Sequence, residues 1–193
     1  FGMAAFLMIG TFDALWVLVL DDLDSPKWIG TVGITLFALP MIFLGSLGGR
    51  LAQRVGPFRL ATLGMSLGAV FMLLYGQVPT GMAMFVVSMV HSLNDATTIS
   101  ASGVAVGMTA PKDRLAGAQG MLGGAQTLIG GISAIMAGTL YEHHGRAVAY
   151  GACAALMAVL IGAGLWLAGP AWLRHHPTGP IAEEYLPEHV PMA

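Results

Sequence analysis

Residues 147–168 read AVAYGACAALMAVLIGAGLWLA, an apolar run without a charged side chain. An α-helix needs about 20 predominantly apolar residues to cross the hydrocarbon core of a bilayer, so this run alone predicts a transmembrane helix. Five further stretches have the same character, at residues 3–20, 29–47, 60–78, 82–108 and 115–140. We therefore predict an all-α, polytopic membrane protein in which six transmembrane helices form one bundle.

The composition of the whole chain supports this prediction. Of 193 residues, 56% are hydrophobic and 9% are charged, whereas roughly 25% are charged in an average soluble domain. A soluble domain of this length exposes much of its area to water and could not hide so much apolar surface. The net charge is -2 and no basic cluster occurs, which argues against a nucleic-acid partner. The expected partner is the lipid bilayer.

Basic residues are distributed unevenly between the two sides of the predicted bundle. Those on the side that also holds both chain ends are Arg50, Arg54, Arg59, Lys112, Arg114 and Arg174. Only Lys27 and Arg146 lie on the other side, beside several acidic residues. Because basic loops stay in the cytoplasm, both termini are predicted to be cytoplasmic in a plasma or inner membrane. Residues 1–169 form the predicted bundle, and the polar, proline-containing segment 170–193 is expected to be a disordered cytoplasmic tail.

A polar stripe marks the fourth predicted helix, 82–108. Members that fall within a sector of about 80°, at 100° per residue, are Ser88, His91, Asp95, Thr98 and Ser102, with Asn94 at the border. A charge at the bilayer centre costs about 2.5–3.5 kcal/mol and needs a reason. His91 and Asp95 are four residues apart and can meet, and such a pair can share one proton. The stripe is predicted to form a substrate or proton pathway; alternatively, it only joins helices through hydrogen bonds.

Three further polar residues lie inside predicted helices. Asp13 is about ten residues into the first one, near mid-depth at 1.5 Å per residue. It is expected to bind a cationic substrate or a proton, or to pair with a residue outside this chain. Gln119 and Gln126 share a face of 115–140 and are predicted to face a cavity, whereas the glycines of that helix are predicted to serve packing. The methionines are spread over every helix, which is typical of packing, so no metal or other cofactor is expected.

The segment 49–56 reads GRLAQRVG. It resembles the glycine-x-leucine-alanine-aspartate-arginine-x-glycine signature of the major facilitator superfamily, in the weaker copy that follows the eighth helix of a full transporter. Gln53 stands where the stronger form has aspartate, and Pro57 stands where a basic residue is usual. Gly49, Arg54 and Gly56 keep the pattern, and the resemblance implies that they belong to a gating loop.

The resemblance implies that this chain corresponds to helices seven to twelve, and that an amino-terminal six-helix half lies outside it. The seventh and tenth helices of the family line a central cavity, and here they carry Asp13 and the polar stripe. The ninth and twelfth are peripheral, and here they are the charge-free stretches 60–78 and 147–168. We expect a secondary transporter that moves a small molecule, not an enzyme. The leading hypothesis is proton-coupled export of drugs or small amphipathic metabolites by alternating access.

Three other functions stay open at this point. An uptake carrier for a sugar or another nutrient could use Asn94, Gln119, Gln126 and the hydroxyl groups of the stripe. An intramembrane serine protease needs a serine in a glycine-rich turn and a histidine on another helix; Ser133 has a poor context for this, and His91 is the only histidine inside a predicted helix. The third alternative is a channel or a purely structural bundle.

Overall fold

A computed structural model describes residues 1–169 of the chain. The predicted disordered tail, 170–193, lies outside the described residues. Seven α-helices and a short 3-10 turn at Lys112–Arg114 make up this part, which contains no strand. The helices are α1 (Gly2–Asp22), α2 (Lys27–Val55), α3 (Pro57–Tyr75), α4 (Gly81–Thr98), α5 (Ser100–Thr109), α6 (Leu115–His144) and α7 (Arg146–Ala168).

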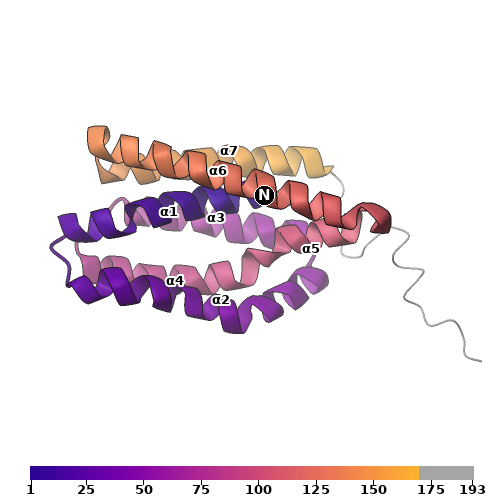
Figure 1. Ribbon diagram of the computed structural model, residues 1–193, viewed down its shortest axis with the longest axis horizontal. Coiled ribbons are helices and arrows are strands. Elements are labelled where there is room, and N and C mark those ends of the chain that lie inside the picture. Colours follow the sequence, from indigo (N-terminus) through magenta and orange to yellow (C-terminus); the bar gives the residue numbers. More distant parts are fainter. Residues whose placement is uncertain (170–193) are drawn as a thin grey trace, which may run out of the picture.

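The long helices lie side by side in three layers (Figure 1), with α1 and α3 in the middle, α6 and α7 on one side, and α2 and α4 on the other. The most extensive pairings are α1 with α6, α2 with α4, and α3 with α7. Exchanging α1, α2 and α3 for α4, α6 and α7 maps this set of pairings onto itself. These three pairings are the ones expected between two three-helix repeats, a relation that transporter bundles commonly show.

Five of the helices are long and apolar enough to cross a membrane: α1, α2, α3, α6 with its preceding turn, and α7. The predicted fourth span is divided into α4 and α5 at Ile99, so six spans in one bundle are not confirmed. At the break, Thr97 and Thr98 direct their hydroxyl groups to the carbonyl oxygen of Asn94, each at 2.8 Å. Such bonds compete with the helical ladder and favour an interruption, and the polar stripe lowers the hydropathy of α4.

The expectation that the charge-free helices are peripheral stays a prediction. In α3, 50% of the most apolar window is buried within the chain, against 11% for α2 and 17% for α6, while Leu63, Leu67 and Val70 are exposed. Contact with another apolar helix excludes charged residues as contact with lipid does. An absence of charge therefore does not distinguish a helix inside the bundle from one at its edge.

The segment with the transporter signature is helical almost to its end. Residues 49–55 form the last turns of α2, so Gly49 and Arg54 lie on a helix and not in a loop. Gly56 alone separates α2 from α3, and its φ of 101° is a conformation that glycine adopts without strain. Pro57 follows at the first position of α3, where a missing N–H group costs nothing. Arg54 is exposed at the carboxyl end of α2, where the helix dipole favours a positive charge.

Two glycines allow close contact between paired helices. In α2, a Cβ atom on Gly48 would lie 2.7 Å from the carbonyl oxygen of Thr97 and 2.8 Å from that of Ala96. In α1, a Cβ atom on Gly10 would overlap with the carbonyl group of Gly130 in α6. The backbones of α2 and α4, and those of α1 and α6, can meet only because these two positions lack a side chain.

Candidate functional site

Helix α4 carries a buried histidine–aspartate pair. The Nε2 atom of His91 lies 3.3 Å from Oδ1 of Asp95, and each side chain is 1% exposed. Nε2 nevertheless has no hydrogen bond of normal geometry within the described part of the chain. We therefore regard the contact as electrostatic, with the ring N–H turned away from the line to the oxygen. The predicted meeting of the two side chains is confirmed, while their role in a pathway stays a prediction.

Aromatic rings from three helices enclose the imidazole of His91. Phe71 of α3 stacks on it, with ring centroids 4.7 Å apart, and Phe37 of α2 meets it edge-on at 5.7 Å. Phe12 of α1 lies at 6.3 Å. Tyr75, also from α3, places its hydroxyl group 3.0 Å from Nδ1. The ring is thus held on several sides, in surroundings that would stabilise a positive charge through aromatic faces.

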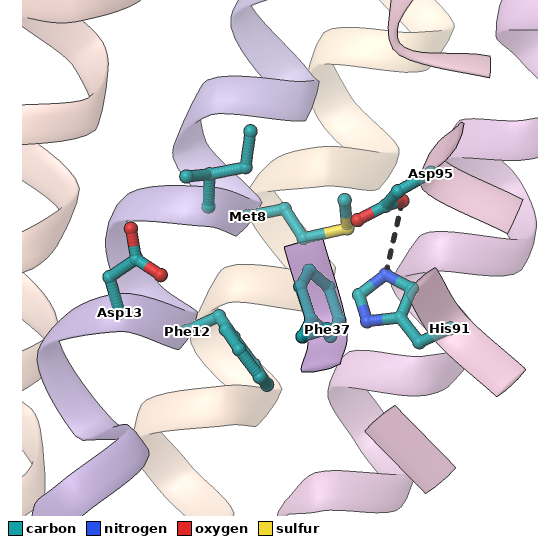
Figure 2. A pocket seen from close by; sticks show the side chains of 7 residues that line it. Met8, Phe12, Asp13, Phe37, His91 and Asp95 are labelled. Carbon is teal, nitrogen blue, oxygen red and sulfur yellow. Dashed lines mark ion pairs between the residues drawn. The ribbon is translucent and has the colours of Figure 1, made fainter. Parts of the chain in front are cut away.

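A small cavity lies between α1, α2 and α4. The side chains that line it are Met8, Ile9, Phe12, Asp13, Phe37, His91 and Asp95. Figure 2 shows Asp13 on one side of it and the His91–Asp95 pair on the other, with Phe37 between them. Its volume is about 20 Å³, enough for about one water molecule. The fold therefore brings three of the predicted site residues together, although a solute fits only if the helices move apart.

Asp13 lies in the middle of α1 on its exposed face, together with Met3 and Val17, which are 42% and 51% exposed. Within residues 1–169 it has no hydrogen bond or ion pair. A carboxylate at this depth of a membrane-spanning helix is costly unless it meets water, a cation or a polar neighbour. Asp13 is therefore a polar group on an exposed face of α1 that also carries the apolar side chains of Met3 and Val17.

Asn94 and Thr98 lie on the side of α4 that packs against α3. The Asn94 amide donates to the carbonyl oxygen of Gly64 at 3.1 Å and to Oδ1 of Asp95 at 3.4 Å. The Thr98 side chain fills the space beside Gly64 and donates its hydroxyl to the Asn94 carbonyl oxygen at 2.8 Å. Neither residue lines the cavity. Asn94 instead links Gly64 of α3 to the Asp95 carboxylate.

Gln119 and Gln126 connect α6 to α5. The Gln119 amide donates to the carbonyl oxygen of Gly103 at 2.9 Å, and it is exposed. Gln126 is 8% exposed and donates to the hydroxyl oxygen of Ser102 at 3.4 Å. The cavity between α1, α2 and α4 includes neither glutamine, so the structure does not bring them to Asp13.

The remaining charged side chains of residues 1–169 lie towards the two ends of the bundle. The α2–α3 junction and the Lys112–Arg114 turn form a basic end, and the α1–α2 and α6–α7 junctions form the opposite, more acidic end (Figure 1). At the acidic end, the Tyr141 hydroxyl group of α6 donates to the carboxylate of Asp22 of α1. Within residues 1–169, no group of three or more histidine, cysteine, aspartate or glutamate side chains could hold a metal ion.

Sequence reasoning missed Phe37, Phe71 and Tyr75 as site residues. The aromatic pair four residues apart in the third stretch was a possible signal, because Phe71 and Tyr75 share one face of a helix. Nothing in the local sequence indicated that this face would meet His91.

The comparisons with known proteins agree with the geometry. The family model described as Major Facilitator Superfamily matches residues 1–186, which include all helices of the described residues and the whole candidate site. No curated protein and no solved structure matches the chain. The resemblance carried by segment 49–56 is thereby confirmed at the level of the family. With its apolar helices and this match, the chain is a multi-pass membrane protein that belongs to the Major Facilitator Superfamily of secondary transporters.

Proposed function

We propose that this chain is part of a proton-coupled transporter that exports drugs or small amphipathic metabolites by alternating access. One observation carries the proposal: a buried histidine–aspartate pair on α4 faces a carboxylate of α1 across a cavity. The pair supplies the proton site, and the exposed face of α1 supplies the contact with the solute.

The burial of the pair supports a proton as the coupling ion. With the imidazole of His91 neutral and Asp95 ionised, the pair carries one negative charge among apolar side chains. Uptake of a proton gives a site without net charge, which relieves the cost of a lone buried charge. Proton uptake from one side and release to the other would drive the transport cycle.

The surroundings of Asp13 support an amphipathic solute with a positive charge. Among residues 1–169, no lysine or arginine lines the cavity, and its walls are mainly Met8, Ile9, Phe12 and Phe37. Such walls hold apolar groups and attract cations through ring faces, while Asp13 supplies the opposite charge. An anionic solute would meet two carboxylates without a basic partner.

The proposal is tested with the purified full-length protein in proteoliposomes, using ethidium as an amphipathic cation and radiolabelled glucose as a polyol. We expect an imposed pH gradient to drive ethidium against its concentration gradient, while glucose does not move. Movement of glucose alone would favour the uptake carrier, and an ionic current without coupling would favour a channel.

Asp13→Asn serves as the matched variant in this assay. Losing the charge contact should raise the KM for ethidium about tenfold, which corresponds to about 1.4 kcal/mol of binding free energy, with little change in kcat. An unchanged KM would remove Asp13 from the solute site.

The alternatives have less support. The amide groups of Asn94, Gln119 and Gln126 donate to atoms of α3 and α5. None of the three residues lines the cavity, so they offer little to a polyol. Ser133 donates to the carbonyl oxygen of Gly130 in its own helix at 2.8 Å and packs beside α1, which is not the arrangement of an activated nucleophile.

The proposed orientation places the basic end of the bundle in the cytoplasm, in a plasma or inner membrane. Exposed positions at the two ends allow a test, in a Cys153→Ala background that removes the buried native thiol. A membrane-impermeant maleimide added to intact cells should label Glu142→Cys and spare Arg114→Cys, which it should label only after the cells are opened. The reverse pattern would invert the proposed orientation.

A further inference from the structure

We infer that Tyr75 is a positioning residue of the proton site, and that its hydroxyl group changes from donor to acceptor when the imidazole of His91 takes up a proton. The inference rests on the proposed proton-coupled function. It assigns a role to α3, a helix without charged residues in its apolar stretch.

Three polar groups lie in series across α3 and α4. Tyr75 ends α3, is fully buried, and places its hydroxyl oxygen 3.0 Å from Nδ1 of His91. On the other side of the imidazole, Nε2 lies 3.3 Å from Oδ1 of Asp95. The stacked ring of Phe71 restricts rotation of the imidazole out of this line. Hydroxyl group, imidazole and carboxylate therefore keep their order while protons move.

The proton positions follow from the donors and acceptors. When the imidazole is neutral and Asp95 is ionised, the single ring proton belongs on Nε2, beside the carboxylate. Nδ1 is then an acceptor, and the Tyr75 hydroxyl group donates to it. When a proton is added, both ring nitrogens become donors, so Nδ1–H donates to the phenol oxygen. A hydroxyl group can serve both states because it is a donor and an acceptor.

The helices packed around His91 determine whether the neutral or the protonated imidazole is favoured. Asp95 faces the imidazole from α4 and Asp13 faces it across the cavity from α1, and both favour a positive charge. From α2 comes the uncharged Phe37. From α3 comes Tyr75, against which Tyr150 of α7 packs with ring centroids 5.6 Å apart.

Tyr75 favours the protonated imidazole. A hydrogen bond to an ionised group is roughly twice as strong as one between neutral groups, so the phenol contributes more after proton uptake than before. In Tyr75→Phe, the Nδ1–H group of the protonated imidazole would be buried among apolar side chains without an acceptor. Leaving this charged donor unpaired costs more free energy than leaving the neutral Nδ1 unpaired. The variant should therefore need a more acidic solution to load its proton.

Tyr150 provides a matched control. It is also fully buried, and its hydroxyl group has no hydrogen bond within the described residues. Tyr150→Phe removes the same atom from the same part of the core without touching His91. An effect that comes only from weaker packing of the core should appear in both Tyr75→Phe and Tyr150→Phe.

The experiment measures ethidium transport in proteoliposomes against pH for the wild-type protein and both variants. We expect the pH at half-maximal transport to fall by about one unit in Tyr75→Phe, a tenfold change worth about 1.4 kcal/mol, with the rate at low pH retained. Tyr150→Phe should keep the wild-type profile. Identical profiles for all three proteins would overturn the inference.

A second measurement does not depend on transport. In protein labelled with 15N-histidine, the His91 signals, identified by their loss in His91→Gln, should show an unprotonated, hydrogen-bonded Nδ1 at high pH that changes in Tyr75→Phe only. If the wild-type protein proves uncoupled, the proposed function falls and this spectrum still decides the Tyr75–His91 contact. If Asp95→Asn loses coupling while Tyr75→Phe matches the wild type, only the role of Tyr75 is wrong.

Discussion

Asp95→Asn is expected to lower pH-gradient-driven ethidium transport by about 100-fold or more, the usual contribution of a positioned proton-transfer group. Asparagine keeps the shape of the side chain but removes the negative charge beside Nε2 of His91. His91 then lacks the carboxylate that stabilises its added proton, so the pH gradient can no longer drive the transport cycle. The measurement is the initial rate of ethidium movement with and without an imposed gradient.

Two controls separate lost coupling from lost folding. Asp113→Asn changes an aspartate that is 77% exposed and pairs with Arg114 at 3.7 Å, and it should transport as the wild type does. Asp95→Asn should still exchange ethidium between the two sides when no gradient is present. A wild-type rate of gradient-driven transport in Asp95→Asn would remove the proton site from α4.

Gly10→Ala is expected to destabilise the bundle by about 2 kcal/mol, within the range for overpacked cores. A Cβ atom at this position would overlap with the carbonyl group of Gly130 and the hydroxyl oxygen of Ser133, and backbone atoms cannot yield as a flexible side chain can. Because α1 and α6 form the most extensive pairing, their separation would weaken the whole bundle. The midpoint of thermal unfolding in detergent should fall by about 4–8 °C.

Gly131→Ala is the matched control, because a Cβ atom there meets no neighbour within 4 Å. It should leave the midpoint unchanged or raise it slightly, since alanine is the better helix former. Equal midpoints for the two variants would contradict the close contact between α1 and α6.

For the glycines of α6, the sequence did not show which of them contact another helix. We predicted that the glycines of 115–140 pack against other helices, yet Gly130 alone among them would bring a Cβ atom near a neighbour, at 3.4 Å from the Phe6 carbonyl oxygen. The tighter contact depends on Gly10 of α1. Spacing along one helix identifies residues that share a face, but it does not identify the face that a neighbour covers.

The helices themselves were predictable because apolar length is a local property. The stretch 147–168 matches α7 within one residue, whereas α2 continues to Val55, beyond the predicted end at residue 47. Hydropathy measures the part of a helix that suits a bilayer, and a helix can extend past it. The interruption at Ile99 depends on where hydroxyl groups turn, which the apolar pattern does not contain.

The sequence predicted those site residues whose ionisable side chains lie inside apolar stretches. Asp13, His91 and Asp95 stand out because ionisable groups are costly in apolar helices, and the fold brings all three to one cavity. Phe37 and Tyr75 gave no such signal, since aromatic residues are ordinary in apolar stretches. Asn94 and Thr98 share a helical sector with His91, and all three residues meet α3. Asn94 and Thr98 lie beside Gly64, however, and do not line the cavity.

The close glycine contacts at Gly10 and Gly48 join α1 to α6 and α2 to α4. Asp13 lies on α1, and the His91–Asp95 pair lies on α4. Any shift of α1 relative to α4 would change the spacing of these negative charges, so the electrostatic energy of the cavity depends on how the two helices are placed.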